Sequence, residues 1–330
     1  MARGTKKQHF VPQLLLRQFA DQNERIYCYD IAADRSFPTI VRDTGHQNHF
    51  LSIPALDGAE GPGAHFEQVF QSVEGPAVDS IRSIDAALAS GILRVVGAPE
   101  RDALSRFIAV QYLRTPAMRE QMFQHVELMR RVLATETMAR NGFDPAVPAI
   151  TSLIDRISQI PKDKEAALHG EHILQPAFIA ELATMFAGHV WLLGVNRTGS
   201  PLYVADNPVA IHGHVERPGR GLGPATYGAE TTIPLSSVLQ LSLFERKFIE
   251  DETGVQDQDG SVFAELSLDN VLFQRSLQVF SARQFIYCEQ DDFADAKRFC
   301  DADPELRDPL RSKVEAVAFG RVERPRRRER

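Results

Sequence analysis

Two helical segments carry polar side chains at positions where their apolar pattern predicts burial. Glu74 falls on the apolar stripe that recurs at three- and four-residue steps through residues 65–88. Gln111 and Arg114 fall on the stripe of the following segment or beside it. A carboxylate on a buried helix face is unfavourable unless it is paired, and Arg114 is the natural partner of Glu74. Two interpretations stay open: a buried ion pair that fixes the register of two helices, or a polar pocket between them.

His9 is the candidate general base. It opens the string His9-Phe10-Val11-Pro12-Gln13, in which Pro12 can begin a short helix. His9 then lies near the N-terminus of that helix, where the helix dipole disfavours the imidazolium form. A neutral imidazole is what a general base or a metal ligand requires. Gln13 is grouped with His9 as a candidate substrate-binding residue.

The string Asp206-Asn207-Pro208 follows a predicted strand. Pro208 favours an extended Asn207, so Asp206 would project beyond the sheet edge as a ligand for a substrate or a metal. The same string is equally suited to a turn. If Asp206 and Glu74 hold a divalent cation, their hard oxygen atoms favour magnesium or manganese over zinc.

Two histidine pairs have spacings that suit a metal site. His169 and His172 stand three positions apart on a predicted helix, so both face one way. His212 and His214 stand two apart at a strand end, with the same consequence. Surface or capping histidines explain such pairs more simply. The common sequence signatures of phosphate loops, dinucleotide-binding folds, nucleophile elbows and zinc proteases do not occur in the chain.

The elements that would position these residues can be predicted from the same patterns. Residues 26–30 and 37–41 predict two neighbouring strands. Pro116 predicts a break near Thr115 between two helices, because proline cannot continue the backbone ladder. Residues 165–187 predict a long helix at the end of the helical part.

The predicted fold class is α+β. A helical middle is expected to pack on a mixed, mainly antiparallel sheet that the N- and C-terminal segments build. Residues 190–195 and 202–205 predict strands that are joined by a turn. A single compact unit is expected over residues 1–320. Its parts are a helical lobe at about 63–187 and a strand-rich lobe at 20–55 and 188–290.

The composition is that of a globular protein, with 43% of the 330 residues hydrophobic and 25% charged. No apolar run approaches the roughly 18–20 residues that span a bilayer, so no membrane partner is expected. Cys28, Cys288 and Cys300 lie far apart, which argues against a disulfide framework and favours the reducing cytoplasm. The formal net charge of −7 argues against a duplex-binding face.

The order of these residues resembles the domain of unknown function 4238 family. Members begin with a His-Tyr-Val-Pro-Gln string, and here Phe10 replaces the tyrosine. The histidines His46 and His49 depart from the family pattern and are not expected to be site residues. The resemblance implies a fold without an established activity. The other matching pieces, in order over most of residues 6–288, are Ile26-Tyr27-Cys28-Tyr29-Asp30, Glu67, Glu74, Gln111-x-x-Arg114-Thr115-Pro116, Trp191, Asp206-Asn207-Pro208-Val209, Pro234-Leu235-Ser236, Asn270 and Phe285-Ile286-Tyr287.

Two hypotheses account for the polar residues. In the first, the protein is a hydrolase acting on a phosphodiester or a related ester, with His9, Glu74 and Asp206 as catalytic residues and the two carboxylates also as metal ligands. Arg114 would hold the anionic group of a nucleic acid or nucleotide substrate. In the second, the protein is a non-catalytic binding or effector module of a stress or anti-phage operon, and its polar cluster is a structural network. The substrate-binding residues of the first hypothesis are Gln13, Gln111, Arg114, Asn207 and Asn270.

The Arg-rich segment 321–330 is predicted to be a disordered tail. It holds six arginines and two glutamates, and only one of its ten residues is a large aliphatic residue. Deleting it should leave the melting temperature unchanged, because such a segment can bury little apolar area. Differential scanning calorimetry of the full and shortened chains measures this. A large loss of stability would mean that the tail docks on the acidic body.

Overall fold

The computed structural model describes residues 7–51, 53–58, 61, 63–216, 221–309 and 311, without the side chains of residues 54, 55, 172 and 173. The chain divides into two compact units. The described part of the larger unit lies within residues 7–120, 161–216 and 222–311, and the smaller unit contains a helical hairpin over residues 121–160. The expectation of one unit over residues 1–320 stays a prediction, and the tail 321–330 lies outside the described residues.

The larger unit contains a five-stranded mixed sheet. Its strand order is β10 (Ser261–Leu266), β5 (Val190–Asn196), β9 (Leu239–Phe244), β8 (Ala229–Pro234) and β7 (Ala210–Gly213). Strand β10 runs parallel to β5, and the other pairs are antiparallel. Every residue of β8 is buried, as expected for an inner strand that is covered on both faces.

A second sheet joins the two ends of the chain. Its four antiparallel strands are β3 (Arg35–Ile40), β2 (Arg25–Asp30), β11 (Phe285–Cys288) and β6 (Val204–Ala205). The predicted strands 26–30 and 37–41 are confirmed as neighbours. The predicted strands 190–195 and 202–205 correspond to β5 and β6, which lie in different sheets: β5 pairs with β9 and β10, whereas β6 pairs with β11. The turn between them carries the chain from one sheet to the other.

A two-stranded ribbon lies at the N-terminal end of the described chain. It consists of β1 (Lys7–His9) and β4 (His46–Asn48), which are antiparallel. In this register His9 stands opposite His46. Gly45, with φ of 63°, precedes β4 and its carbonyl oxygen accepts hydrogen bonds from Phe10 and Val11. A β-carbon at Gly45 would also lie 3.0 Å from Leu16, so this turn requires glycine.

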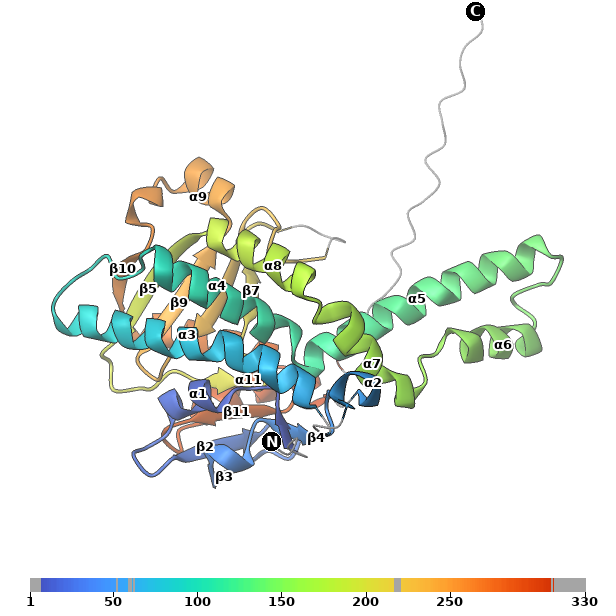
Figure 1. Cartoon of the computed structure of the whole chain (residues 1–330), viewed down its shortest axis with the longest axis horizontal. Helices are drawn as coiled ribbons and strands as arrows, with labels where there is room; N and C mark the ends of the chain where they lie inside the picture. The colour runs from blue at the N-terminus through green and yellow to red at the C-terminus, as the bar shows by residue number, and fades with distance from the viewer. Residues whose placement is uncertain are drawn as a thin grey trace, which may run out of the picture. The chain divides into compact units, whose positions relative to one another are not determined.

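Three helices of the larger unit pack side by side: α3 (Ala64–Ala89), α4 (Ala98–Leu113) and α8 (Pro176–Gly188) (Figure 1). Helix α10 (Leu268–Ser281) contacts β7 and β10 of the five-stranded sheet and β6 of the four-stranded sheet. These contacts confirm the α+β fold class. The other helices are α1 (Gln13–Leu16), α2 (Pro54–Asp57), α5 (Pro116–Arg140), α6 (Pro148–Ser158), α7 (Glu165–Leu168), α9 (Arg246–Glu252), α10 (Leu268–Ser281) and α11 (Ala294–Ala302).

Two prolines decide where the helices end. The break predicted near Thr115 is confirmed, since α4 ends at Leu113 and α5 begins at Pro116. The single helix predicted over 165–187 is wrong. Instead α7 passes into a π-helical turn, and α8 starts anew at Pro176, because the residue before a proline prefers an extended backbone. No helix among the described ranges is long and apolar enough to cross a membrane.

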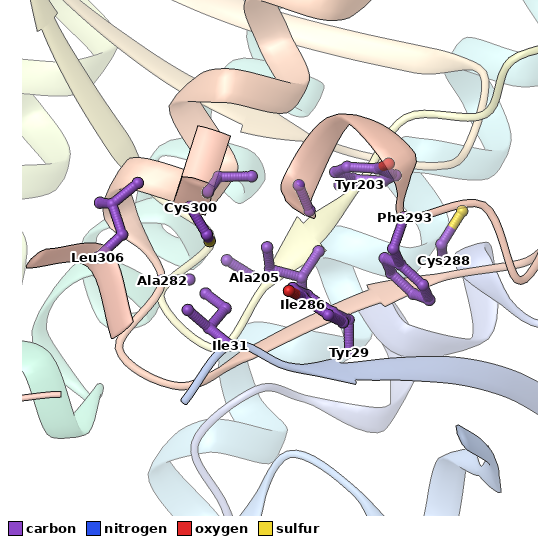
Figure 2. Close-up of a cluster of buried hydrophobic side chains, with 12 residues drawn as sticks. Tyr29, Ile31, Tyr203, Ala205, Ala282, Ile286, Cys288, Phe293, Cys300 and Leu306 are labelled. Carbon is purple, nitrogen blue, oxygen red and sulfur yellow. The ribbon is translucent and has the colours of Figure 1, made fainter. Parts of the chain in front are cut away.

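A buried cluster joins the four-stranded sheet to α10 and α11 (Figure 2). The ring of Phe293 lies against Tyr29 and Tyr203, with centroids 5.5 and 5.6 Å apart. Cys288 and Cys300 are part of this cluster, and all three cysteines of the chain are free and buried. Burial raises the pKa of the Cys288 thiol to about 12, so this thiol stays protonated and packs as an apolar group.

Candidate functional site

Arg114 lies at the C-terminal end of α4 with only 1% of its side chain exposed. Its Nη1 donates to Oε1 of Glu74 at 2.7 Å, and its Nε donates to Oε1 of Gln111 at 2.8 Å. The guanidinium also lies over the ring of Phe70, 4.7 Å from the centroid. The ion pair expected between α3 and α4 is therefore present, and 26% of the Glu74 side chain is exposed.

Gln111 connects this ion pair to the N-terminal ribbon. Its Nε2 donates to the carbonyl oxygen of Phe10 at 3.0 Å, while its Oε1 accepts from Arg114. Both ends of a fully buried amide are thereby satisfied, as burial demands. The contact fixes the backbone of the residue next to His9 against helix α4.

His9 is half-buried on β1 and faces His46, with ring centroids 5.3 Å apart. The pKa of His9 is lowered to about 4, because burial disfavours the imidazolium and His46 and Arg114 add unfavourable charge. A hydrogen bond to the backbone of Arg42 acts in the opposite direction. Nε2 of His9 is buried and has no hydrogen-bond partner within the described ranges. The Arg42 bond therefore belongs to Nδ1–H, and Nε2 carries a free lone pair.

Two further polar groups of this cluster are unsatisfied in the described part of the chain. Nη2 of Arg114 and both ring nitrogens of His46 are buried and without a partner. Buried donors and acceptors in this state are rare, and a bound molecule is one of the common explanations. Arg114 offers a cationic donor and His9 a neutral acceptor, which together suit an anionic substrate and an attacking water.

Glu67 lies on α3, two turns before Glu74. Burial raises the pKa of Glu67, the negative charge of Glu74 raises it further, and Arg114 opposes both effects. A carboxyl group in this environment keeps its proton to a higher pH than an exposed one. Glu67 therefore stands beside the ion pair as a candidate proton donor.

Asp206 and Asn207 form a separate network. The buried carboxylate of Asp206 accepts the backbone N–H groups of Arg283, Gln284 and Phe285 at 2.7, 2.8 and 3.0 Å. The amide of Asn207 accepts from the Thr115 hydroxyl at 3.0 Å and donates to the Ser281 carbonyl at 3.2 Å.. These bonds hold the crossing from β6 to β7 against the turn that precedes β11.

The last two predicted residues, Gln13 and Asn270, bond to neighbouring residues on the protein surface. Oε1 of Gln13 accepts from Arg17 at 2.9 Å. Asn270 is exposed and forms a capping box with Ser267 at the start of α10. The structure thus groups Glu74, Gln111 and Arg114 with His9, and leaves Gln13 and Asn270 outside that group.

No group of three or more His, Cys, Asp or Glu side chains that could hold a metal ion is present among the residues described. The carboxylate of Asp206 is buried and accepts three backbone hydrogen bonds. The expected magnesium or manganese site at Glu74 and Asp206 stays a prediction. His169 is held between the Arg119 guanidinium, at 2.9 Å, and the Leu113 carbonyl, at 2.8 Å. His214 binds the buried carboxylate of Glu230 at 2.9 Å.

Two residues of the cluster, His46 and Glu67, are not among the predicted site residues. His46 was set apart because its string departs from the family pattern, and only the β1–β4 register places it opposite His9. Glu67 was noted as a matching glutamate without a role. Its signal was present in the sequence, since Glu67 and Glu74 stand seven positions apart and therefore share one helix face.

Fold and site together define an α+β protein with a buried arginine–glutamate pair where helix α4 meets a short N-terminal ribbon. The chain belongs to the family described as Protein of unknown function (DUF4238), whose model matches residues 7–292. The resemblance seen in the sequence is thereby confirmed. No curated protein and no solved structure matches the chain.

Replacing Glu74 tests the buried ion pair. Glu74→Ala should lower the free energy of unfolding by about 3 kcal/mol, because it leaves the buried charge of Arg114 without its carboxylate. Urea denaturation of the parent and the variant measures the difference. Adding Arg114→Met should recover part of the loss, since no unpaired charge then remains. A melting temperature within one degree of the parent for Glu74→Ala would contradict the pairing.

Replacing Asp206 tests the crossing between the two sheets. Asp206→Asn should lower the free energy of unfolding by roughly 2–4 kcal/mol. The new amide nitrogen is a donor and would face backbone N–H groups whose hydrogen bonds the carboxylate now accepts. Thermal unfolding with and without millimolar manganese separates the two roles. A parent protein that manganese stabilises, through a response lost in Asp206→Asn, would instead favour the metal site.

Proposed function

We propose that this protein hydrolyses a phosphodiester or a related ester in the cytoplasm, at the cluster of His9, Glu67 and Arg114. The observation that supports the proposal is the pair of buried atoms His9 Nε2 and Arg114 Nη2, which lack partners within the described part of the chain. One is a lone-pair acceptor and the other a cationic donor. A substrate oxygen that accepts from Arg114 and a water that donates to His9 would satisfy both.

In the proposed reaction, His9 Nε2 removes a proton from the water as its oxygen bonds to the phosphorus or carbonyl carbon. A low pKa keeps His9 neutral at physiological pH and therefore ready to accept this proton. The bond to the leaving oxygen then breaks, and that oxygen needs a proton. Glu67 supplies it, and the proton on His9 returns to Glu67 through solvent.

Charge limits the size of the substrate. The chain carries a net charge of −7, which repels a long polyanion, while the buried charge of Arg114 attracts a single anionic group. Glu74 accepts a hydrogen bond from Nη1 of the guanidinium, so Nη2 would be available to a ligand. A dinucleotide or another small diester fits these conditions better than a nucleic acid duplex.

The pH dependence of the rate tests the assignment of base and acid. Below pH 4 His9 is protonated and cannot act as base, and above the raised pKa of Glu67 the acid is lost. We expect a bell-shaped profile of kcat/KM for an alkyl diester such as a dinucleotide, highest at mildly acidic pH. Glu67→Gln should remove the alkaline limb, and should matter little for a nitrophenyl ester, whose leaving group needs no proton.

Replacing His9, the proposed general base, should give the largest loss of kcat/KM. His9→Gln should lower kcat/KM by about 10²–10⁴-fold, the usual contribution of a general base. His65→Gln is the matched control, because His65 is an exposed histidine at the start of α3. Equal rates for His9→Gln and the parent, or no turnover of any diester or ester by the parent, would overturn the proposal.

A second candidate, a non-catalytic binding or effector module of a stress or anti-phage operon, is favoured by one observation. Asp206, Asn207 and Asn270 bond to the protein itself, as members of a structural network would. In that case the unpaired Nη2 of Arg114 retains an anion without changing it. Isothermal titration with a nucleoside monophosphate would show binding without turnover, and Arg114→Met would abolish the binding.

A further inference from the structure

The helical hairpin of the smaller unit has almost no core of its own. It comprises α5 from Gln121 onward and α6, which are joined by polar contacts. Arg131 pairs with Asp155 at 3.0 Å, and Glu127 accepts the backbone N–H of Ile160 at 2.7 Å. Of residues 121–160 only four are buried, namely Phe123, Ile154, Ser158 and Ile160.

The same hairpin exposes an unusual amount of apolar surface. Met129 is 65% exposed, Leu133 61% and Phe143 53%. Isolated apolar side chains on a protein surface are ordinary, whereas a contiguous set marks an interaction site. The full set of exposed large apolar side chains in the hairpin is Met129, Val132, Leu133, Phe143, Val147 and Ile157.

The spacing along α5 is that of a helix–helix seam. Met122, Val126, Met129 and Leu133 follow one another at intervals of four, three and four residues. This 3.5-residue repeat brings the four side chains onto one stripe that can pack against another helix. Met122 and Val126 are half-buried, and Met129 and Leu133 are exposed. The stripe therefore runs out onto a face that nothing in the described chain covers.

The formal charge of the hairpin indicates which kind of partner covers its exposed apolar face. Residues 121–160 contain four arginines and four carboxylates, so their formal charge is zero, while the whole chain carries −7. A neutral surface gives no attraction to a nucleic acid or to a strongly charged protein, and two copies of it do not repel each other. Such a face is suited to a second copy of the same chain.

The available area is sufficient for a stable pair. The twenty residues of α5 in the hairpin form a helix about 30 Å long, and α6 adds a second, shorter helix. A stable interface buries roughly 800 Å² and 20–30 residues on each side. A hairpin of forty residues that presents two helices can supply this, and a pair of hairpins completes a four-helix bundle with an apolar core.

We propose that the 121–160 hairpin is a homodimer interface, in which the exposed Met129–Leu133 stripe packs against its copy in a four-helix bundle. The proposal is independent of the hydrolytic site, since it rests on different residues in a different unit. It gives the protein a two-fold symmetric assembly, because one self-complementary patch closes after two copies.

Sedimentation equilibrium of the full chain tests the proposal. The parent should sediment as a dimer at about 100 µM. The combined change Met129→Glu and Leu133→Glu should raise the dimer Kd at least about a hundredfold, because it places like charges in an apolar core. The matched control is Leu93→Glu, at an equally exposed apolar residue of the larger unit, 65% exposed. It should leave the dimer intact.

Cross-linking gives a second reading that does not depend on a destabilising change. All three native cysteines are buried, so Leu133→Cys introduces a single exposed thiol. A short bismaleimide should join two such chains and should fail to join chains that carry Leu93→Cys instead. A monomeric parent at 100 µM concentration (roughly a hundredfold above the micromolar Kd expected of such a dimer), a dimer unaffected by the two glutamates, or equal loss with Leu93→Glu would each overturn the proposal.

Discussion

Arg114 keeps a full positive charge at the end of α4 with almost no contact with water, and the arrangement around it follows from the need to compensate that charge. Glu74 supplies the carboxylate from α3, which fixes how the two helices align. Gln111 supplies a second acceptor and uses its own amide to hold the carbonyl oxygen of Phe10. One buried guanidinium thereby ties two helices and the N-terminal ribbon together. Its Nη2 has no hydrogen-bond partner among the described residues.

Asp206 and Asn207 belong to a hydrogen-bond network that is separate from that of Arg114. Asp206 bonds to backbone N–H groups, and Asn207 bonds to the Thr115 hydroxyl and the Ser281 carbonyl. These bonds hold the chain where it passes from one sheet to the other. Within the described residues, Nε2 of His9 and Nη2 of Arg114 are buried without a hydrogen-bond partner, which is unfavourable. In the proposed hydrolysis, a bound substrate and a water would satisfy both atoms.

Much of this could be predicted where the signal is local. The helical stripe made Glu74 and Arg114 partners, and Pro116 determined the break between α4 and α5. The pairing of His9 with His46 could not be predicted, because three-residue strands carry no usable alternation and their register depends on Gly45. Asp206 stays a predicted ligand or turn residue. Its three hydrogen bonds from backbone N–H groups could not be predicted, because a sequence does not show which of these groups will surround a carboxylate. The partners of the two strands on either side of the turn after residue 195 could not be predicted either, because each strand pairs with a segment distant in the sequence.

The four-stranded sheet has a consequence for the order in which the protein is made. Gln284 bonds to Asp30 from 254 residues away, beside the point where β11 pairs with β2. At roughly 5–20 residues per second of synthesis, β2 therefore emerges tens of seconds before its partner. Throughout that interval one edge of the N-terminal hairpin lacks its neighbour and offers free backbone groups to any other extended chain. The protein should thus be a client of chaperones that shield nascent edges, and its folding should be slow relative to helical proteins of equal length.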